Sequence, residues 1–292
     1  MDILWTDPES TLTKWKTPLF ENENIIELPV DQRTITRRCT QKSIDFIKVN
    51  QKKPFFIYIP HSMPHIPLYV PDEVRDPDPQ NAYFNTIEHI DTEVGRLLNT
   101  LDELKLTGKT YVIYTTDNGP WLSFRHHGGS AGPLRDGKGT TFEGGQRVPC
   151  VMRGPGIPAG TECSNLMGTI DLLPTFASIT GKSLPKGIKI DGVDACSLLT
   201  GDGSPPRNEF MHYTSRGEVE GIRQGNWKLL IKKRRGKSAQ DSEVFLFDLK
   251  KDLGESNNLA SKKAKIVSKM KNRMIQVDEE ITKNARTPWF ME

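Results

Sequence analysis

The run Pro54-Phe55-Phe56-Ile57-Tyr58-Ile59-Pro60 decides how the fold of this 292-residue chain is interpreted. It is short and nearly continuously apolar, as expected of a strand that is buried on both faces. A second apolar run, Thr110-Tyr111-Val112-Ile113-Tyr114-Thr115-Thr116, predicts the next strand. Between the two, apolar side chains recur at three- and four-residue steps, which predicts an amphipathic helix that ends at Gly108. These side chains are Ile87, Ile90, Val94, Leu97, Leu98, Leu101 and Leu104.

Strand, helix and strand at this spacing are typical of a βαβ crossover in a parallel sheet, so the chain is predicted to be an α/β protein. In open α/β sheets, ligands bind beyond the carboxyl ends of the strands. The first strand leads into His61 and His65, and the second leads into Asp117 and Asn118. We therefore expect both polar clusters at one edge of the sheet.

The remaining elements predict a second, smaller part of the chain. A helix is expected over residues 34–49, a strand over 148–153, and a helix over 170–179 with Thr169 as its cap. Residues 201–206 resemble a linker. Beyond them, strands at 220–231 and 243–249 and a final helix predict a small antiparallel α+β subdomain. The predicted domains are 1–200 and 201–292. The final helix carries Ile266, Val267, Met270, Met274 and Val277 on one stripe.

Composition limits the classes of function. Lys and Arg number 40 against 37 Asp and Glu, so a net charge of +3 gives no indication of nucleic-acid binding. The basic run at residues 232–237 is interpreted as a solvated hairpin tip rather than a contact for a polyanion. No apolar stretch is long enough for a transmembrane helix, and residues 1–7 lack the pattern of a signal peptide. The four scattered cysteines fit one disulfide or four buried thiols equally well.

Two short motifs carry candidate site residues. Asp117 and Asn118 are adjacent oxygen donors, which suit Ca²⁺ or Mg²⁺ better than zinc, although Asp-Asn-Gly also forms plain turns. His61 and His65 lie beside prolines that stiffen their loop, which suits a proton donor or an anion ligand. The alternative is a pair of ordinary surface histidines.

The stretch from Gly128 to Gly145 holds seven glycines in eighteen residues, which lets the backbone approach a ligand closely. Lys138, between two glycines, offers a point charge for a tetrahedral oxyanion. Arg135, Phe142 and Glu143 lie among the glycines. A merely flexible loop would rarely contain such charged and aromatic side chains. The stretch does not match a nucleotide-binding P-loop.

The order of these motifs resembles the arylsulfatase family from about residue 30 to 275. Asp117-Asn118-Gly119-Pro120 is followed by Gly137-Lys138-Gly139-Thr140-Thr141-Phe142-Glu143-Gly144-Gly145, and Pro64-His65-Ile66-Pro67 precedes both. The tail segments 222–229, 246–249 and 255–259 are also similar to that family's C-terminal subdomain.

The resemblance implies an alkaline-phosphatase-like fold, with a mostly parallel sheet flanked by helices, and hydrolysis of sulfate esters. Asp117 and Asn118 would ligate Ca²⁺, or Mg²⁺ in its place. Lys138 would hold the sulfate, and His65 would protonate the leaving alcohol, with His61 as a secondary candidate. The implied ligand is a sulfated small molecule or glycan, and the implied compartment is secreted, periplasmic or lysosomal. The oligomeric state stays open.

The family's nucleophile, a formylglycine made from Cys or Ser within C/S-x-P-x-R, has no counterpart in these 292 residues. The upstream Asp pair of the metal site is absent as well. We therefore expect this chain to be the C-terminal portion of a sulfatase that hydrolyses sulfate esters in its complete form, and to be inactive alone. The alternatives are a non-catalytic protein that binds sulfated ligands and another phosphoesterase of the alkaline-phosphatase-like superfamily.

Overall fold

The computed structural model describes residues 17–201, 205–233 and 242–287. These residues form two compact units. The first unit extends to Tyr111 and also includes Trp121–Ser130. The second unit holds Val112–Pro120 and the chain from Ala131 onward. The division predicted at residue 200 lies inside the second unit and stays a prediction.

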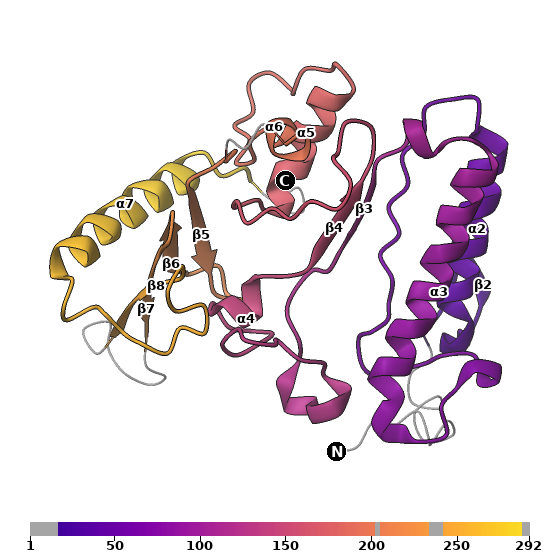
Figure 1. Cartoon of the computed structure of the whole chain (residues 1–292), viewed down its shortest axis with the longest axis horizontal. Coiled ribbons are helices and arrows are strands. Elements are labelled where there is room, and N and C mark those ends of the chain that lie inside the picture. Colours follow the sequence, from indigo (N-terminus) through magenta and orange to yellow (C-terminus); the bar gives the residue numbers. More distant parts are fainter. Residues whose placement is uncertain (1–16, 202–204, 234–241, 288–292) are drawn as a thin grey trace. The chain divides into compact units, whose positions relative to one another are not determined.

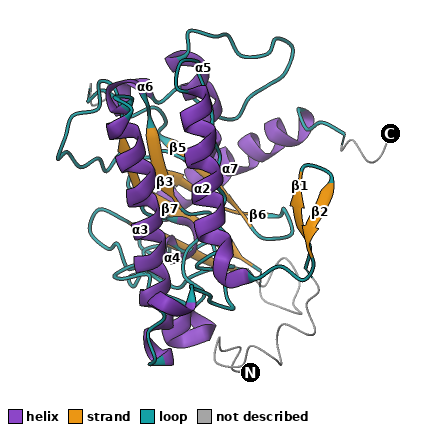
Figure 2. Ribbon diagram, turned by 90° about the vertical axis from the view of Figure 1, so that its right-hand side faces the viewer, coloured by secondary structure: helices purple, strands orange, loops and turns teal. Residues whose placement is uncertain are grey.

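Two long helices run side by side in the first unit (Figure 1). They are α2 (Ile35–Asn50), which confirms the helix predicted over 34–49, and α3 (Ala82–Glu103). α2 buries Thr36, Thr40, Ile44 and Ile47, a spacing that keeps one helical face against its neighbour. A short antiparallel hairpin, β1 (Leu19–Glu21) and β2 (Asn24–Glu27), precedes them (Figure 2). Short 3-10 helices η1 (Gln32–Thr34), η2 (Asp72–Val74), η3 (Pro79–Asn81), η4 (Thr107–Lys109) and η5 (Leu122–His127) connect these elements.

The predicted end of α3 at Gly108 was wrong. The helix ends at Glu103, and Lys105 adopts a left-handed backbone conformation with φ of 57°. The N–H of Leu106 then donates to the carbonyl of Leu101, which satisfies one of the last helical carbonyls. Glycine usually occupies such a position, so a lysine there concealed the helix end from sequence analysis.

The parallel βαβ unit is not observed among the described residues. Residues 54–60 belong to no strand, and every strand pairing is antiparallel. The apolar run is also not buried on both faces, because Phe56 is 71% exposed and Tyr58 78% exposed. The sequence predicted an extended segment, but strand pairing depends on a partner that local sequence does not specify.

The second unit begins with β3 (Val112–Thr115), which pairs antiparallel with β4 (Cys150–Arg153). The short helices α4 (Glu143–Gln146), α5 (Leu172–Ile179) and α6 (Cys196–Leu199) and the 3-10 helix η6 (Thr169–Asp171) follow in the same unit. Thr169 does not cap α5. Instead, the fully buried Asp171 carboxylate accepts the N–H groups of Gly168 and Val193, each at 2.8 Å, and pairs with Arg207.

The C-terminal part of the second unit is a four-stranded antiparallel sheet covered by α7 (Ala264–Lys283) (Figure 1). Its strands are β5 (Glu209–Tyr213), β6 (Val219–Gln224), β7 (Trp227–Lys232) and β8 (Glu243–Asp248). One face packs Leu229 and Leu246 against Met270 and Met274 of α7. The neighbouring residue Leu230 points to the opposite face and is also fully buried, so both faces of the sheet are covered.

The antiparallel subdomain and its final helix confirm the prediction, whereas the strand predicted over 220–231 is two strands. Gly225 adopts a left-handed conformation with φ of 55° and reverses the chain between β6 and β7. Strand β5 was not predicted at all. β7 and β8 form the expected hairpin, whose predicted basic tip at 234–237 lies outside the described residues.

The four cysteines form neither a disulfide nor a set of buried thiols. All four are free, three are exposed, and Cys196 is half-buried. They are therefore not part of the core, which contradicts both sequence interpretations. No helix among the described residues has the length and apolarity needed to cross a bilayer.

His212 of β5 is a buried titratable group in this sheet. It is 4% exposed, and neither ring nitrogen has a hydrogen-bond partner among the described residues. Burial, together with the nearby positive charges of Lys228 and Arg223, lowers its pKa to about 3. The folded protein therefore holds His212 neutral, while the unfolded chain protonates it near pH 6.5.

We predict that His212 makes the protein acid-sensitive. Because its folded-state pKa is depressed, its contribution to stability is present above pH 6.5 and is lost as the pH falls toward 3. Between pH 6.5 and 4.5 the free energy of unfolding should fall by about 2 kcal/mol through this group alone. Urea unfolding at a series of pH values should show a shallower decline in His212→Phe than in the wild type. His61 and His89, whose pKa values are also lowered by burial, act equally in both proteins. Parallel curves would contradict the prediction.

Candidate functional site

The Asp117-Asn118 turn and the glycine-rich loop are joined through their backbones in the second unit. The turn follows β3 directly. The N–H of Gly119 donates to the carbonyl of Gly145 at 3.2 Å, and the N–H of Lys138 donates to the carbonyl of Pro120 at 2.8 Å. Two motifs separated by about twenty residues of sequence are therefore held together by main-chain hydrogen bonds.

Three glycines permit this close backbone packing. A Cβ atom on Gly119 would lie 1.7 Å from the carbonyl oxygen of Gly144. A Cβ on Gly144 would lie 2.1 Å from the carbonyl oxygen of Asp136, and a Cβ on Gly145 would lie 2.3 Å from that of Thr140. These distances are far below a normal contact, so no other residue fits. The glycines were expected to let the backbone approach a bound ligand, but these three make room for the protein's own backbone.

The other unusual residues of the loop anchor it to the C-terminal sheet. Phe142 is buried against Leu230, Phe247 and Leu249. The guanidinium of Arg135 lies over the Phe142 ring at 4.0 Å from its centroid. Glu143 is 2% exposed and forms an ion pair with Lys228 of β7 at 2.9 Å. These contacts explain why an aromatic ring, a carboxylate and a guanidinium occur among so many glycines.

Lys138 lies between these anchored segments. It is half-buried, whereas Thr141, Phe142 and Glu143 are fully buried. Asp136, two residues earlier, has φ of 63°, and its carboxylate accepts the N–H of Gly137 at 3.0 Å. This tight turn, together with the Lys138–Pro120 hydrogen bond, fixes the main chain from which the ammonium group extends. A cation that extends from an anchored main chain is suited to binding a tetrahedral anion.

His65 lies in the first unit, on an exposed loop. Its Nδ1 atom is 2.7 Å from the carbonyl oxygen of Ile66. A carbonyl can only accept, so Nδ1 carries the hydrogen and Nε2 is the atom left to exchange a proton. The ring packs at 5.6 Å from that of Trp121, which follows Asn118 by three residues. Sequence analysis missed Trp121, although its place directly after Asp-Asn-Gly-Pro was a usable signal.

His61 has a different environment in the same unit. It is half-buried, and its Nδ1 atom is enclosed without a hydrogen-bond partner among the described residues. Burial lowers its pKa, and the nearby carboxylate of Glu93 opposes this only in part. The ring is therefore neutral at pH 7. His61 lies near His89 and Glu93 of α3, which favours a structural role over contact with an anion.

The Asp117-Asn118 turn provides only part of what a calcium site requires. Asp117 is exposed and Asn118 is half-buried, and their side chains offer the oxygen donors that calcium prefers. Calcium takes six to eight oxygen ligands, however. Among the described residues, no group of three or more His, Cys, Asp or Glu side chains could hold a metal ion. The residues fit calcium in kind but not in number.

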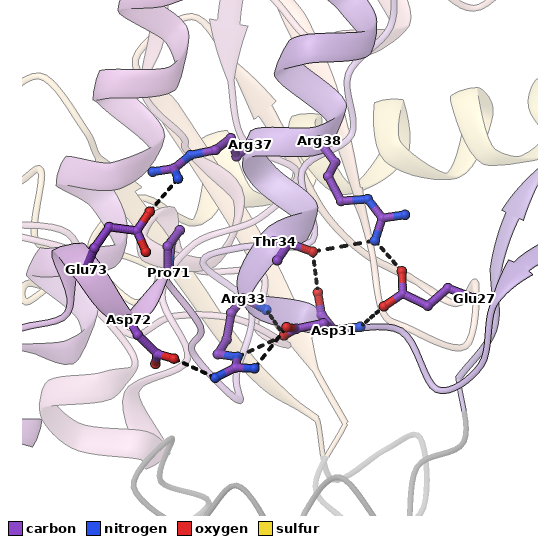
Figure 3. Close-up of a pocket in the computed structure, with 9 residues that line it drawn as sticks. All are labelled: Glu27, Asp31, Arg33, Thr34, Arg37, Arg38, Pro71, Asp72 and Glu73. Atoms are coloured by element: carbon purple, nitrogen blue, oxygen red, sulfur yellow. Dashed lines mark hydrogen bonds and ion pairs between the residues drawn. The ribbon is translucent and has the colours of Figure 1, made fainter.

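A pocket of about 540 Å³ in the first unit contains none of the predicted site residues (Figure 3). Its guanidinium groups already face carboxylates: Arg33 pairs with Asp31 at 2.9 Å and Asp72 at 2.6 Å, and Arg37 and Arg38 also form ion pairs. The Arg33 guanidinium holds the pKa of Asp31 below its usual range. Since these positive charges are neutralised within the protein, the pocket offers little attraction for an anionic ligand.

Comparisons with known proteins show similarity to sulfatases. A family model described as Sulfatase matches residues 5–182, and one described as N-sulphoglucosamine sulphohydrolase, C-terminal, matches residues 136–280. Arylsulfatase A of Bos taurus is 35% identical over 230 residues, which cover 72% of this chain and 45% of that protein. The chain spans about half the length of the curated relatives it matches.

Solved structures share the fold. The crystal structure of Ps i-CgsB in complex with k-i-k-neocarrahexaose superposes with a TM-score of 0.78 at 27% identity, over 94% of this chain and 60% of that one. A structure in complex with its substrate D-glucosamine-2-N,6-O-disulfate has a TM-score of 0.55 at 26% identity, over 70% of this chain and 41% of that one. The expected alkaline-phosphatase-like fold is therefore confirmed, although the part of the chain that the structure describes contains no parallel strand pairing.

We predict that Gly119→Ala disrupts the joined turn and loop. The added methyl group would collide with the carbonyl oxygen of Gly144, so the free energy of unfolding should fall by about 3 kcal/mol. Gly95→Ala is the control, because a Cβ at this helical position meets nothing within 4 Å. It should raise stability by about 0.5–1 kcal/mol. Chemical denaturation of both variants measures the difference, and equal stabilities would refute the packing argument.

Proposed function

We propose that this chain, which belongs to the sulfatase family, supplies the sulfate-binding and leaving-group side of an active centre that hydrolyses sulfate esters. The observation that carries the proposal is the pair of backbone hydrogen bonds between the Asp117-Asn118 turn and the Lys138 loop. These bonds join the turn that carries two oxygen donors to the loop that carries a cation, and both kinds of group can offset the negative charge of a sulfuryl group.

Lys138 is assigned the sulfate group. Its ammonium offers up to three hydrogen-bond donors and one positive charge, which suit the oxygens of a sulfate ester. When the S–O bond breaks, negative charge grows on the departing oxygen, and a cation already in place stabilises that charge without reorganisation. The backbone anchoring of residues 137–145 supports this role, because it limits the positions that the ammonium can take.

His65 is assigned the leaving alcohol. With Nδ1 donating to the carbonyl of Ile66, Nε2 is the atom that carries a proton to an alkoxide. The ring is exposed, so a substrate can reach it, and the contact with Trp121 restricts its rotation. His61 remains a secondary candidate. Its partial burial argues against direct contact with the substrate.

Asp117 and Asn118 are assigned to Ca²⁺, or to Mg²⁺ in its place, as part of a larger ligand set. A bound divalent cation would offset the charge of the sulfuryl oxygens. Because the chain contributes only these two side chains among the described residues, we expect its own affinity for calcium to be low.

The substrate class follows from the same assignment. The ligand is a sulfated small molecule or a sulfated glycan, which is supported by the likeness to a structure bound to D-glucosamine-2-N,6-O-disulfate. By family, we place the protein in a secreted, periplasmic or lysosomal compartment. The particular ester depends on pocket side chains that the fold does not fix.

We predict that inorganic sulfate binds at Lys138. Titration of the ¹⁵N-labelled 292-residue chain with sodium sulfate, at constant ionic strength, should shift the amide signals of residues 137–139. Lys138→Met should weaken this binding at least about tenfold, which corresponds to about 1.4 kcal/mol. Lys250→Met removes the same charge from an exposed position of the second unit and should leave the affinity unchanged. Binding that is insensitive to Lys138 would overturn the assignment.

We also predict that the 292-residue chain by itself does not hydrolyse 4-nitrophenyl sulfate. The physical reason is that it contains no C/S-x-P-x-R sequence from which the formylglycine nucleophile is made. The purified wild type, assayed with calcium, should release 4-nitrophenol no faster than Lys138→Met. A faster rate in the wild type would show that another group in this chain acts as nucleophile.

A further inference from the structure

A cluster of three buried charged side chains lies behind the Lys138 loop. The ammonium of Lys228 on β7 is 2.9 Å from Glu143 Oε1 and 3.0 Å from Glu255 Oε1. The side chains of Lys228 and Glu255 are 0% exposed, and that of Glu143 is 3% exposed. Arg223 of β6 lies 3.7 Å from the second oxygen of Glu143, so two positive charges face two negative ones.

Glu255 connects both ends of the loop. Its Oε2 atom accepts the backbone N–H of Glu143 at 2.6 Å, and its own carbonyl oxygen accepts Arg135 Nη1 at 2.8 Å. The carbonyl of Arg135 in turn accepts the N–H of Gly144 at 2.8 Å. Glu255 adopts φ of 51°, a conformation that non-glycine residues rarely take. The backbone is thus bent to present this carboxylate to the loop.

Such a cluster is a poor source of stability. Burial of each charge removes its water, and burial raises the pKa of Glu255 even though Lys228 and the Glu143 N–H oppose the shift. Well-packed apolar residues would stabilise the same volume at least as well. What the charges provide is geometry, because each ion pair and hydrogen bond fixes a direction and a distance. A loop with seven glycines between residues 128 and 145 has little conformational preference of its own and needs such external constraints.

We propose that Glu143, Lys228 and Glu255 are positioning residues, which hold residues 137–145 in the one conformation that presents Lys138 to sulfate. The C-terminal sheet then contributes to the site indirectly, because its strand β7 supplies the cation that orders the loop. This inference rests on the proposed function only for the identity of the ligand. The ordering of the loop can be measured without any ligand.

Hydrogen exchange of the 292-residue chain tests the ordering. The amides of Lys138, Gly144 and Gly145 are hydrogen-bonded, so their exchange reports local opening of the loop. Lys228→Met should speed their exchange at least tenfold more than that of the β7–β8 ladder. Met270→Ala is the matched control, because it weakens the opposite, apolar face of the same sheet. It should leave the loop amides unchanged.

A second variant guards against failure of Lys228→Met to fold. Arg135→Leu removes the contact with the Glu255 carbonyl without leaving a buried charge unpaired, and it should speed exchange of the same loop amides at least threefold. Uniform acceleration across the unit in both variants, or loop exchange equal to that of Met270→Ala, would overturn the inference.

Sulfate titration of the same variants separates the two proposals. If Lys228→Met weakens sulfate binding at residues 137–139 about tenfold and Met270→Ala does not, both proposals are supported. If sulfate binds Lys228→Met as tightly as the wild type, the positioning role is wrong and the proposed function stands. If wild-type binding is insensitive to Lys138, the proposed function fails, and the exchange rates still decide whether the cluster orders the loop.

Discussion

The contact between Lys228 and the two carboxylates of Glu143 and Glu255 is the constraint on which the site region depends. All three side chains are buried, and the glycine-rich loop has no other ionic tie of comparable burial among the described residues. A single ammonium thereby joins a strand of the C-terminal sheet, the loop that carries Lys138, and the segment after β8. Removing such a charge leaves carboxylates without compensation in a low-dielectric region, which proteins tolerate poorly.

Two different forces hold the loop in place, and they act on different sides of it. Phe142 and the sheet residues Leu230 and Phe247 provide apolar burial, which is strong but weakly directional. Main-chain hydrogen bonds from the Lys138 N–H to the Pro120 carbonyl and from the Gly119 N–H to the Gly145 carbonyl join the loop to the turn segment, and these bonds are directional but modest in net free energy. The combination explains a loop that is rich in glycine yet is buried from Thr141 to Gly145.

Much of the fold could be predicted because helical periodicity is a local property. α2, α3 and α7 and the β7–β8 hairpin appear where the apolar patterns indicated. The wrong predictions concern features that depend on a pairing partner elsewhere in the chain or on a single backbone dihedral angle. The run at 54–60 forms no strand of a sheet. Lys105, just after α3, adopts a left-handed backbone conformation that is usual for glycine. Neither strand partners nor an unusual φ leave a reliable trace in one sequence.

By itself, the sequence indicated the family and the glycine-rich loop and marked Asp117, Asn118, Lys138 and His65 as candidate site residues, because these inferences rest on residue types at fixed spacing. Only the tertiary structure decided what Phe142, Glu143 and the glycines do. Their partners lie up to 112 residues away along the chain, as in the hydrogen bond from Glu143 to Glu255. Contacts of that range depend on how a sheet and a loop pack together, and side-chain periodicity records only which residues are buried, not what they meet.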